Sequence, residues 1–464
     1  MLIIAAGVVA FLPSFLCSRN FLADAFYYLT LAKGLPFKYS LPSYAHFKYL
    51  PAFPALILLS HLLTGRLIDF MNAAKLVSML SLIATSVLVF DFVYYRLRSF
   101  PSALGAGIIA ILSPAFLLFS GNILSELPFT FFASAAFVFM LRKKPYLPWI
   151  FAALAILTRY EGIFLIPALI IGQWRAPKKL ALGALIMIII CGPWVFFILS
   201  NFGKFFAFSY PTEAIIAQGH AGFLFLWDMV RCLSPMIVVL GMAGILLLPR
   251  ALRPGMVLFI SGYIILHMYW HWRDARFIVP MVPFFALGAA FAVDRLFQTY
   301  LPPGKSSGKI ALAGILALTA VSLALFDGFA FRELAGLRRD PRKAVMQKIL
   351  QYDPSAVVLT NIEPVVCEWY GVKNVHRWSD LKRTDDAYAW AAERYAKDGA
   401  RYLVWRKTDN FAILFFKELG QKGLLTKTVQ LQGQARAIAF YPILFEDSGK
   451  MIVFSIEMNP APKP

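Results

Sequence analysis

The sequence predicts a polytopic α-helical membrane protein of about eleven spans, followed by a C-terminal extracytoplasmic α/β domain. Of its 464 residues, 59% are hydrophobic and only 15% are charged, whereas a soluble domain typically carries about 25% charged residues. Residues 1–326 hold 24 Lys and Arg but 9 Asp and Glu, while residues 327–464 hold 21 and 16. A wholly water-soluble protein is therefore excluded, and the two parts of the chain suit different solvents.

Apolar runs in the first part recur at about the length that a helix needs to cross a bilayer, roughly 20 residues. The first run has no basic segment before it and no A-x-A cleavage site after it, so we expect a spanning helix rather than a cleaved signal peptide. It is short, which leaves a misassigned start codon as an alternative. The eleven predicted spans are 2–17, 73–95, 102–120, 127–141, 147–158, 162–173, 180–199, 223–248, 255–272, 277–294 and 310–328.

Alternate loops between these runs collect most of the basic residues on one side, which the positive-inside rule makes cytoplasmic. They are Arg96, Arg98, Arg142, Lys143, Lys144, Arg175, Lys178, Lys179, Arg250, Arg253, Arg295, Lys305 and Lys309. The first outer loop, 18–72, contains an apolar stretch from Leu50 to Leu63. We expect an amphipathic helix at the outer interface there, because a span would place the clusters at 142–144 and 175–179 outside.

We divide the chain into a transmembrane domain, 1–329, and a soluble domain, 330–464, on the outer side of a cytoplasmic (inner) membrane. The second domain alternates predicted strands with predicted helices, which indicates a parallel or mixed sheet. It contains no G-x-G-x-x-G or P-loop, so nucleotide binding has no support. It either grips an acceptor or serves as a structural cap. The expected strands are 356–360, 402–405, 438–441 and 451–456, and the expected helices are 363–370 and 385–397.

Two further features exclude classes of function. The net charge of +20 does not indicate nucleic-acid binding, because Lys and Arg form short clusters between apolar runs rather than one basic face. The four cysteines share no close spacing, so neither a disulfide framework nor a thiolate metal site is supported. They are Cys17, Cys191, Cys232 and Cys367.

Acidic residues are rare before residue 327, and each needs a reason, because an ionisable group in a membrane is costly unless it is paired or lines a wet cavity. Asp24 precedes an apolar helix just outside the first span. It could accept a proton from an acceptor group or bind a divalent cation, or it could cap the helix, which the spacing alone favours. The topology places six acids outside: Asp24, Asp69, Glu126, Glu161, Glu213 and Asp274.

Several cations lie on the outer side against the positive-inside trend. Arg159, Arg273 and Arg276 could bind phosphate oxygens, whereas Lys204 is better interpreted as a headgroup-contacting side chain at a helix end. His267 and His271 lie four residues apart on one helix face, as a metal or phosphate site would need. No third ligand is evident, so an interfacial aromatic belt is the preferred interpretation.

Five motifs occur in an order and spacing that resemble the GT-C superfamily of membrane glycosyltransferases, over most of residues 18–295. The resemblance is to the branch of protein O-mannosyltransferases and the aminoarabinose transferase of lipid A, which is family-39-like. The motifs are Asp24 with FYYLTLA after it, FKYLPAFPAL from Phe47 leading into LTG at Leu63, SELP from Ser125, LAILTRYEG from Leu154, and RFIVPMVP from Arg276.

This resemblance implies transfer of a sugar from a polyprenyl-phosphate carrier to a lipid, glycan or protein acceptor on the outer face of the membrane. It places the catalytic carboxylates at Asp24 and Glu126. A leaving phosphate needs cations where charge develops, and these are expected at Arg276, Arg159 and Arg273. Contacts with the acceptor or the first loop are expected from Tyr27, Tyr28, His46, Lys48 and Glu161.

No cofactor is firmly indicated, although Asp24 and Glu126 are candidate ligands for Mg or Mn. Expected partners are the donor, membrane lipids and the acceptor, and not nucleic acid. The alternative function is a polyprenyl-lipid carrier transporter or a non-catalytic membrane assembly protein. A transporter often shows an inverted repeat with broken spans in both halves, and none is evident here.

Overall fold

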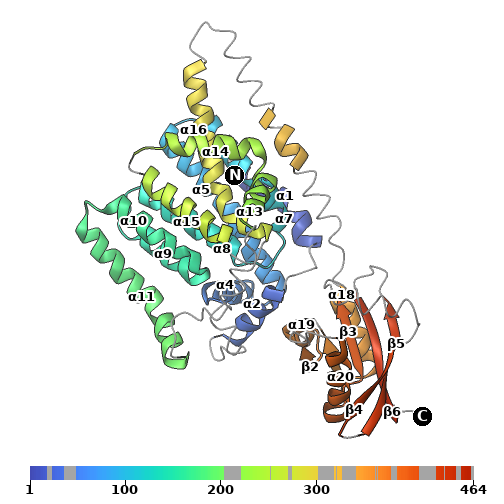
Figure 1. Cartoon of the computed structure of the whole chain (residues 1–464). Helices are drawn as coiled ribbons and strands as arrows, with labels where there is room; N and C mark the ends of the chain where they lie inside the picture. Colours follow the sequence, from blue (N-terminus) through green and yellow to red (C-terminus); the bar gives the residue numbers. More distant parts are fainter. Residues whose placement is uncertain are drawn as a thin grey trace. The chain divides into compact units, whose positions relative to one another are not determined.

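The computed structural model separates the chain into two compact units (Figure 1). We name them the helical unit, Met1–Ser18 with Leu31–Arg338, and the sheet unit, Arg19–Thr30 with Arg339–Pro464. The structure describes residues 1–17, 23–35, 49–202, 221–250, 252–269, 274–300, 318–319, 321–326, 341–360, 362, 364–377, 384–406, 425–432, 434–445 and 451–460.

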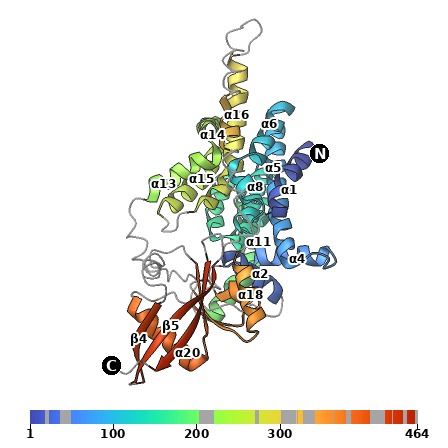
Figure 2. The same ribbon diagram turned by 90° about the vertical axis from the view of Figure 1, so that its right-hand side faces the viewer.

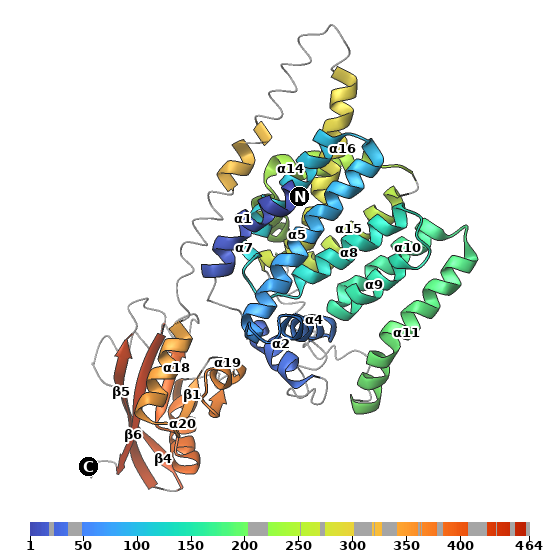
Figure 3. The same cartoon turned by 180° about the vertical axis from the view of Figure 1, so that it is seen from behind.

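The helical unit is built from the apolar runs of the sequence. Its elements are α1 (Leu2–Cys17), α4 (Ala52–Leu63), α5 (Phe70–Leu97), α6 (Phe100–Ile111), α7 (Pro114–Phe119), α8 (Glu126–Leu141), α9 (Leu147–Thr158), η1 (Tyr160–Phe164), α10 (Leu165–Gln173), α11 (Pro177–Phe202), α13 (Ala221–Leu233), α14 (Pro235–Leu247), α15 (Arg253–Tyr269), η2 (Ala275–Met281) and α16 (Val282–Tyr300). Helices α5, α8 and α9 lie side by side (Figure 3).

Three helices of the described residues are long and apolar enough to cross a membrane, namely Phe70–Leu97, Pro177–Asn201 and Ala275–Thr299. The bent pair α13 and α14 would add a fourth if the two helices formed one span. Shorter apolar helices make up much of the rest. The chain is therefore a mostly helical membrane protein, and the count of eleven spans stays a prediction.

Hydropathy predicts one continuous span over residues 223–248, but the chain bends there by 99° between α13 and α14. Figure 2 shows the change of direction. Ser234 has φ of 69°, and Pro235 occupies the start of α14. Proline has no N–H and fits the first turn of a helix, whereas inside a helix it removes a hydrogen bond and favours a kink or a break. Ser234 and Pro235 therefore account for the break. A hydropathy average over the whole run 223–248 does not detect it, because it measures only how apolar the run is.

Helices α14 and α16 pack backbone against backbone through three glycines. A Cβ added at Gly244 would lie 1.6 Å from the carbonyl oxygen of Gly288, and one at Gly288 would lie 2.3 Å from that of Gly241. Small residues allow membrane helices to approach this closely. The crossing therefore tolerates no side chain at these positions.

Three acids of the helical unit have structural partners. Asp69 caps α5 by accepting a hydrogen bond from the backbone N–H of Asn72 at 2.7 Å. Asp91 forms an ion pair with Arg142, and Asp294 accepts a hydrogen bond from Gln298 at 2.7 Å. The positions of these three acids are therefore explained by helix capping and by pairing with neighbouring side chains.

The sheet unit contains a six-stranded mixed sheet with the order β2-β1-β3-β6-β5-β4. Strand β1 pairs in parallel with β2 and β3, and the remaining pairs are antiparallel. Helices α18 and α20 lie on the same face of it (Figures 1 and 3). Its elements are α18 (Pro341–Tyr352), β1 (Val357–Thr360), α19 (Pro364–Trp369), β2 (Asn374–Arg377), α20 (Thr384–Asp398), β3 (Tyr402–Arg406), β4 (Leu425–Leu431), β5 (Gln434–Phe445) and β6 (Met451–Pro460).

The sheet unit also includes the first residues of α2 (Ala23–Gly34), through Thr30. Phe26 is fully buried, and its ring makes edge contacts with Trp369 at 6.2 Å and Tyr370 at 5.5 Å between centroids. The guanidinium of Arg342 lies over the same ring at 5.4 Å. The helix turns that carry Asp24 therefore fold with the C-terminal part of the chain.

Candidate functional site

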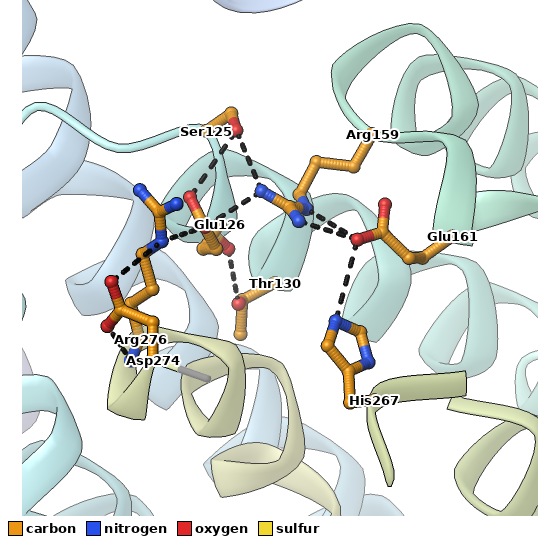
Figure 4. Close-up of polar contacts among 8 residues, drawn as sticks. All are labelled: Ser125, Glu126, Thr130, Arg159, Glu161, His267, Asp274 and Arg276. Carbon is orange, nitrogen blue, oxygen red and sulfur yellow. Dashed lines mark hydrogen bonds and ion pairs between the residues drawn. The ribbon is translucent and has the colours of Figure 1, made fainter. Parts of the chain in front are cut away.

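Charged side chains from four segments of the helical unit meet in one place, which we name the charged cluster (Figure 4). Figure 4 shows Ser125, Glu126 and Thr130 from the start of α8, Arg159 and Glu161 at the end of α9 and in η1, His267 from α15, and Asp274 and Arg276 at η2. Most of the neighbouring core is apolar. In such surroundings charges must be paired to be tolerated.

Glu126 is the centre of the charged cluster and is 1% exposed. Its Oε1 lies 2.8 Å from Nη1 of Arg159 and 3.2 Å from Nε of Arg276. Ser125 Oγ donates to its Oε2 at 3.4 Å, and Thr130 Oγ1 donates to its backbone carbonyl at 2.6 Å. An acid in the first turn of a helix is also favoured by the helix dipole. Glu126 therefore links two arginines that are distant in sequence.

Arg159 follows the last turn of α9 in extended backbone with φ of −151°. Its Nε and Nη2 donate to Oε1 of Glu161 at 3.2 and 2.5 Å, and Nη1 donates to Ser125 Oγ at 3.2 Å. Burial opposes the charge on Arg159, but Glu126 and Glu161 raise its pKa well above the ordinary value. Burial likewise opposes the charge on Glu161, but Arg159 holds the pKa of that carboxyl below its usual range. Both groups are therefore charged at neutral pH.

Arg276 is held by the turn that begins η2. Asp274 accepts a hydrogen bond from the backbone N–H of Arg276 at 3.0 Å, and its Oδ2 lies 3.3 Å from Nε of Arg276. The guanidinium groups of Arg276 and Arg159 lie 5.1 and 5.5 Å from the centroid of the Phe277 ring. A cation over an aromatic face is attracted by the ring quadrupole. Phe277 and Glu126 therefore orient both arginines.

His267 borders the charged cluster. Its Nδ1 lies 2.9 Å from the carbonyl oxygen of Tyr263, and because a carbonyl only accepts, Nδ1 carries the proton. Its Nε2 then faces Oε1 of Glu161 at 3.7 Å. The hydroxyl of Tyr263 is buried and has no hydrogen-bond partner among the described residues. The Tyr263 ring stacks on that of His267, with 4.2 Å between their centroids.

The structure brings together Glu126, Arg159, Arg276 and Glu161 from the residues that sequence predicts for the site. It groups Asp24, Tyr27 and Tyr28 with the sheet unit, where both tyrosines are 5% exposed. The predicted residues His46, Lys48 and Arg273, like His271 and Lys204, lie outside the described residues.

Sequence reasoning did not identify four of the residues drawn in Figure 4 as site residues: Ser125, Thr130, His267 and Asp274. The available signals were weak, since Ser125 merely precedes Glu126 and Asp274 lies two residues before Arg276. His267 was paired in sequence with His271, whereas in the structure its charged neighbour is Glu161. A contact of this kind depends on how η1 packs against α15, which local spacing does not reveal.

The described residues contain no group of three or more His, Cys, Asp or Glu side chains that could hold a metal ion. In addition, Oε1 of Glu126 lies next to two guanidinium groups, and neighbouring positive charges disfavour a divalent cation by Coulomb repulsion. The cation site at Asp24 and Glu126 stays a prediction without support from this geometry.

No protein-family model matches the chain, and no curated protein sequence matches it. Its fold is similar to crystal structures of ArnT from Cupriavidus metallidurans. The structure bound to undecaprenyl phosphate matches with a TM-score of 0.63 at 14% identity, and the apo structure with 0.66 at 15%. Each match covers 98% of this chain and 97% of that chain. The resemblance to the GT-C lipid A aminoarabinose transferase is thereby confirmed at the level of the fold.

Proposed function

We propose that this chain is an integral-membrane glycosyltransferase that moves a sugar from a polyprenyl-phosphate carrier to a lipid, glycan or protein acceptor. The reaction would take place on the outer face of a cytoplasmic membrane. The observation that carries the proposal is the pair Arg159 and Arg276, oriented by one buried carboxylate among apolar helices. The likeness to a structure crystallised with undecaprenyl phosphate supports the same carrier.

The arginines have the chemistry that the leaving group requires. When the bond between the sugar and the phosphate breaks, negative charge develops on the phosphate oxygens. Preorganised cationic donors lower the barrier of such a step, and loss of one donor typically costs about 10²-fold to 10³-fold in rate. Arg159 and Arg276 would bind the phosphate, the Tyr263 hydroxyl would donate a further hydrogen bond, and Glu126 would act as a positioning residue for both arginines.

Asp24 is the proposed base. The acceptor oxygen or nitrogen attacks the anomeric carbon of the sugar while the bond from that carbon to the phosphate oxygen breaks. The phosphate leaves with the electron pair, and the proton of the acceptor passes to the Asp24 carboxylate. A positioned carboxylate contributes about 10²-fold to 10⁴-fold by this route. The sheet unit would then be extracytoplasmic, since it includes the turns of α2 that carry Asp24.

A transfer assay with Arg276→Gln tests the phosphate role. Purified protein in detergent is incubated with radiolabelled polyprenyl-phosphate sugars and a membrane extract that supplies acceptors. We expect kcat/KM for the donor to fall by about 10²-fold or more. Arg142→Gln is the matched control, because Arg142 also pairs with a carboxylate but lies outside the charged cluster. Equal loss in both variants, or none in Arg276→Gln, would contradict the assignment.

Binding of the carrier without transfer to any acceptor would favour the alternative function, a carrier transporter. In that case the arginine variant would still weaken binding, but wild-type protein would leave all label on the donor. The two functions are therefore distinguished by whether the label is transferred to an acceptor, because both functions involve binding of the carrier.

A further inference from the structure

We propose that Glu161 is a built-in counter-ion that occupies the phosphate-binding edge of Arg159 and that the carrier phosphate must displace it. The inference rests on the proposed function, because it concerns how the same cluster admits its ligand. It assigns Glu161 a role in setting carrier affinity and release, in place of a contact with the acceptor.

The hydrogen bonds of Arg159 carry the argument. A guanidinium binds phosphate best through two parallel N–H groups on one edge. Glu161 Oε1 receives both N–H groups of one such edge, Nε at 3.2 Å and Nη2 at 2.5 Å. The remaining nitrogen, Nη1, lies 2.8 Å from Glu126 and donates to Ser125. A phosphate that binds Arg159 through its Nε and Nη2 edge therefore has to replace Glu161.

Of the two carboxylates that contact Arg159, Glu161 can move away from it with the smaller loss of interactions. Glu126 is 1% exposed and interacts with both arginines, so its departure would separate them. The side chain of Glu161 is 13% exposed, and its ion pair is with Arg159. Rotation of the Glu161 side chain therefore opens the edge of Arg159 while Glu126 continues to orient the guanidinium.

The balance of charge gives the direction of the effect. Among the six ionisable residues of the cluster, Arg159 and Arg276 carry positive charge, three carboxylates carry negative charge, and His267 is counted as neutral. Adding an anionic phosphate to this largely buried set increases like-charge repulsion. Glu161 therefore competes with the donor and with the carrier phosphate that remains after transfer. Its return to Arg159 would assist release of that product.

The test measures binding of undecaprenyl phosphate to full-length protein in detergent by isothermal titration calorimetry. We expect Glu161→Gln to bind about tenfold more tightly than wild type, equivalent to about 1.4 kcal/mol, and its kcat to fall because release slows. The control Asp91→Asn removes a carboxylate that also pairs with an arginine, Arg142, and it should bind as wild type does.

Weaker or unchanged binding by Glu161→Gln would overturn the inference, because a purely structural role predicts loss of affinity and not a gain. Glu161→Asp is the second variant should the glutamine variant fold poorly. It keeps the charge but has a shorter reach, so it should also bind more tightly than wild type. Wild-type protein that does not bind undecaprenyl phosphate would overturn the proposed function as well, whereas binding without tightening overturns this inference alone.

Discussion

Replacement of Glu126 by glutamine tests the arrangement of the charged cluster. The substitution keeps the size of the side chain but removes its charge. Glu126 Oε1 is the contact that Arg159 and Arg276 share, at 2.8 and 3.2 Å. After the change Arg159 retains Glu161 and Arg276 retains Asp274, but nothing in the cluster links the two arginines by charge. We expect both lower stability and weaker phosphate binding.

The magnitude follows from burial. Removing one partner of a buried ion pair typically costs about 3–5 kcal/mol, because the other charge is left uncompensated. The side chains of Arg159 and Arg276 keep 16% and 10% exposure, and each retains one carboxylate partner, so we take the lower end, about 3 kcal/mol. The control Asp91→Asn breaks a pair whose side chains are 35% and 33% exposed. Exposed pairs contribute about 0–1 kcal/mol.

The assay is the free energy of unfolding from denaturant titration in mixed micelles, with both variants measured beside wild type. The expected gap between Glu126→Gln and Asp91→Asn is about 2 kcal/mol, which is a factor of about 30 in the unfolding equilibrium. Equal destabilisation by the two variants would refute the argument from burial. A Glu126→Gln protein as stable as wild type would refute the central position of Glu126.

Three further predictions concern the fold. Gly244→Ala should destabilise the helical unit by about 1–3 kcal/mol or more. Gly105→Ala should not, because a Cβ added at Gly105 would have no neighbouring atom within 4 Å. Thermal unfolding of the two variants measures the difference. Trp369→Ala removes a contact with Phe26 and should raise amide hydrogen exchange in residues 23–30. A hydrogen bond from Arg394 lowers the pKa of Asp398, so this pair stabilises the sheet unit above about pH 4. That contribution is lost as the pH falls through the lowered pKa, and Asp398→Asn should remove this part of the acid dependence of unfolding.

The sequence identifies several residues of the site more readily than it identifies which of them contact one another. Glu126, Arg159 and Arg276 stand out because charge near apolar runs needs an explanation. Their mutual contacts depend on how α8, η1 and η2 pack, and no local pattern encodes that. The sequence therefore predicted Arg159 and Arg276 as phosphate ligands but could not show that carboxylates hold both of them.

Like the site, the fold could be predicted from the sequence only in part. Hydropathy predicted the long helix α5 and the strands β1, β3, β5 and β6, all of which the structure contains. It did not predict strands β2 and β4, or the break at Ser113, where a capping serine and Pro114 start a new helix within the run 102–120. Membership of α2 in the sheet unit depends on Phe26 meeting α18 and α19, a long-range contact beyond the reach of periodicity.

The central claim is sugar transfer from a polyprenyl-phosphate carrier with Asp24 as the base, and one transfer assay with two variants tests it most directly. Asp24→Asn keeps the size of the side chain and removes the base. Asp69→Asn is its control, because Asp69 belongs to the same predicted outer loop, and asparagine is as good a helix cap as aspartate. The account predicts label in an acceptor with wild type and Asp69→Asn, and at least about 10²-fold slower transfer with Asp24→Asn. Transfer at the wild-type rate by folded Asp24→Asn protein would contradict it.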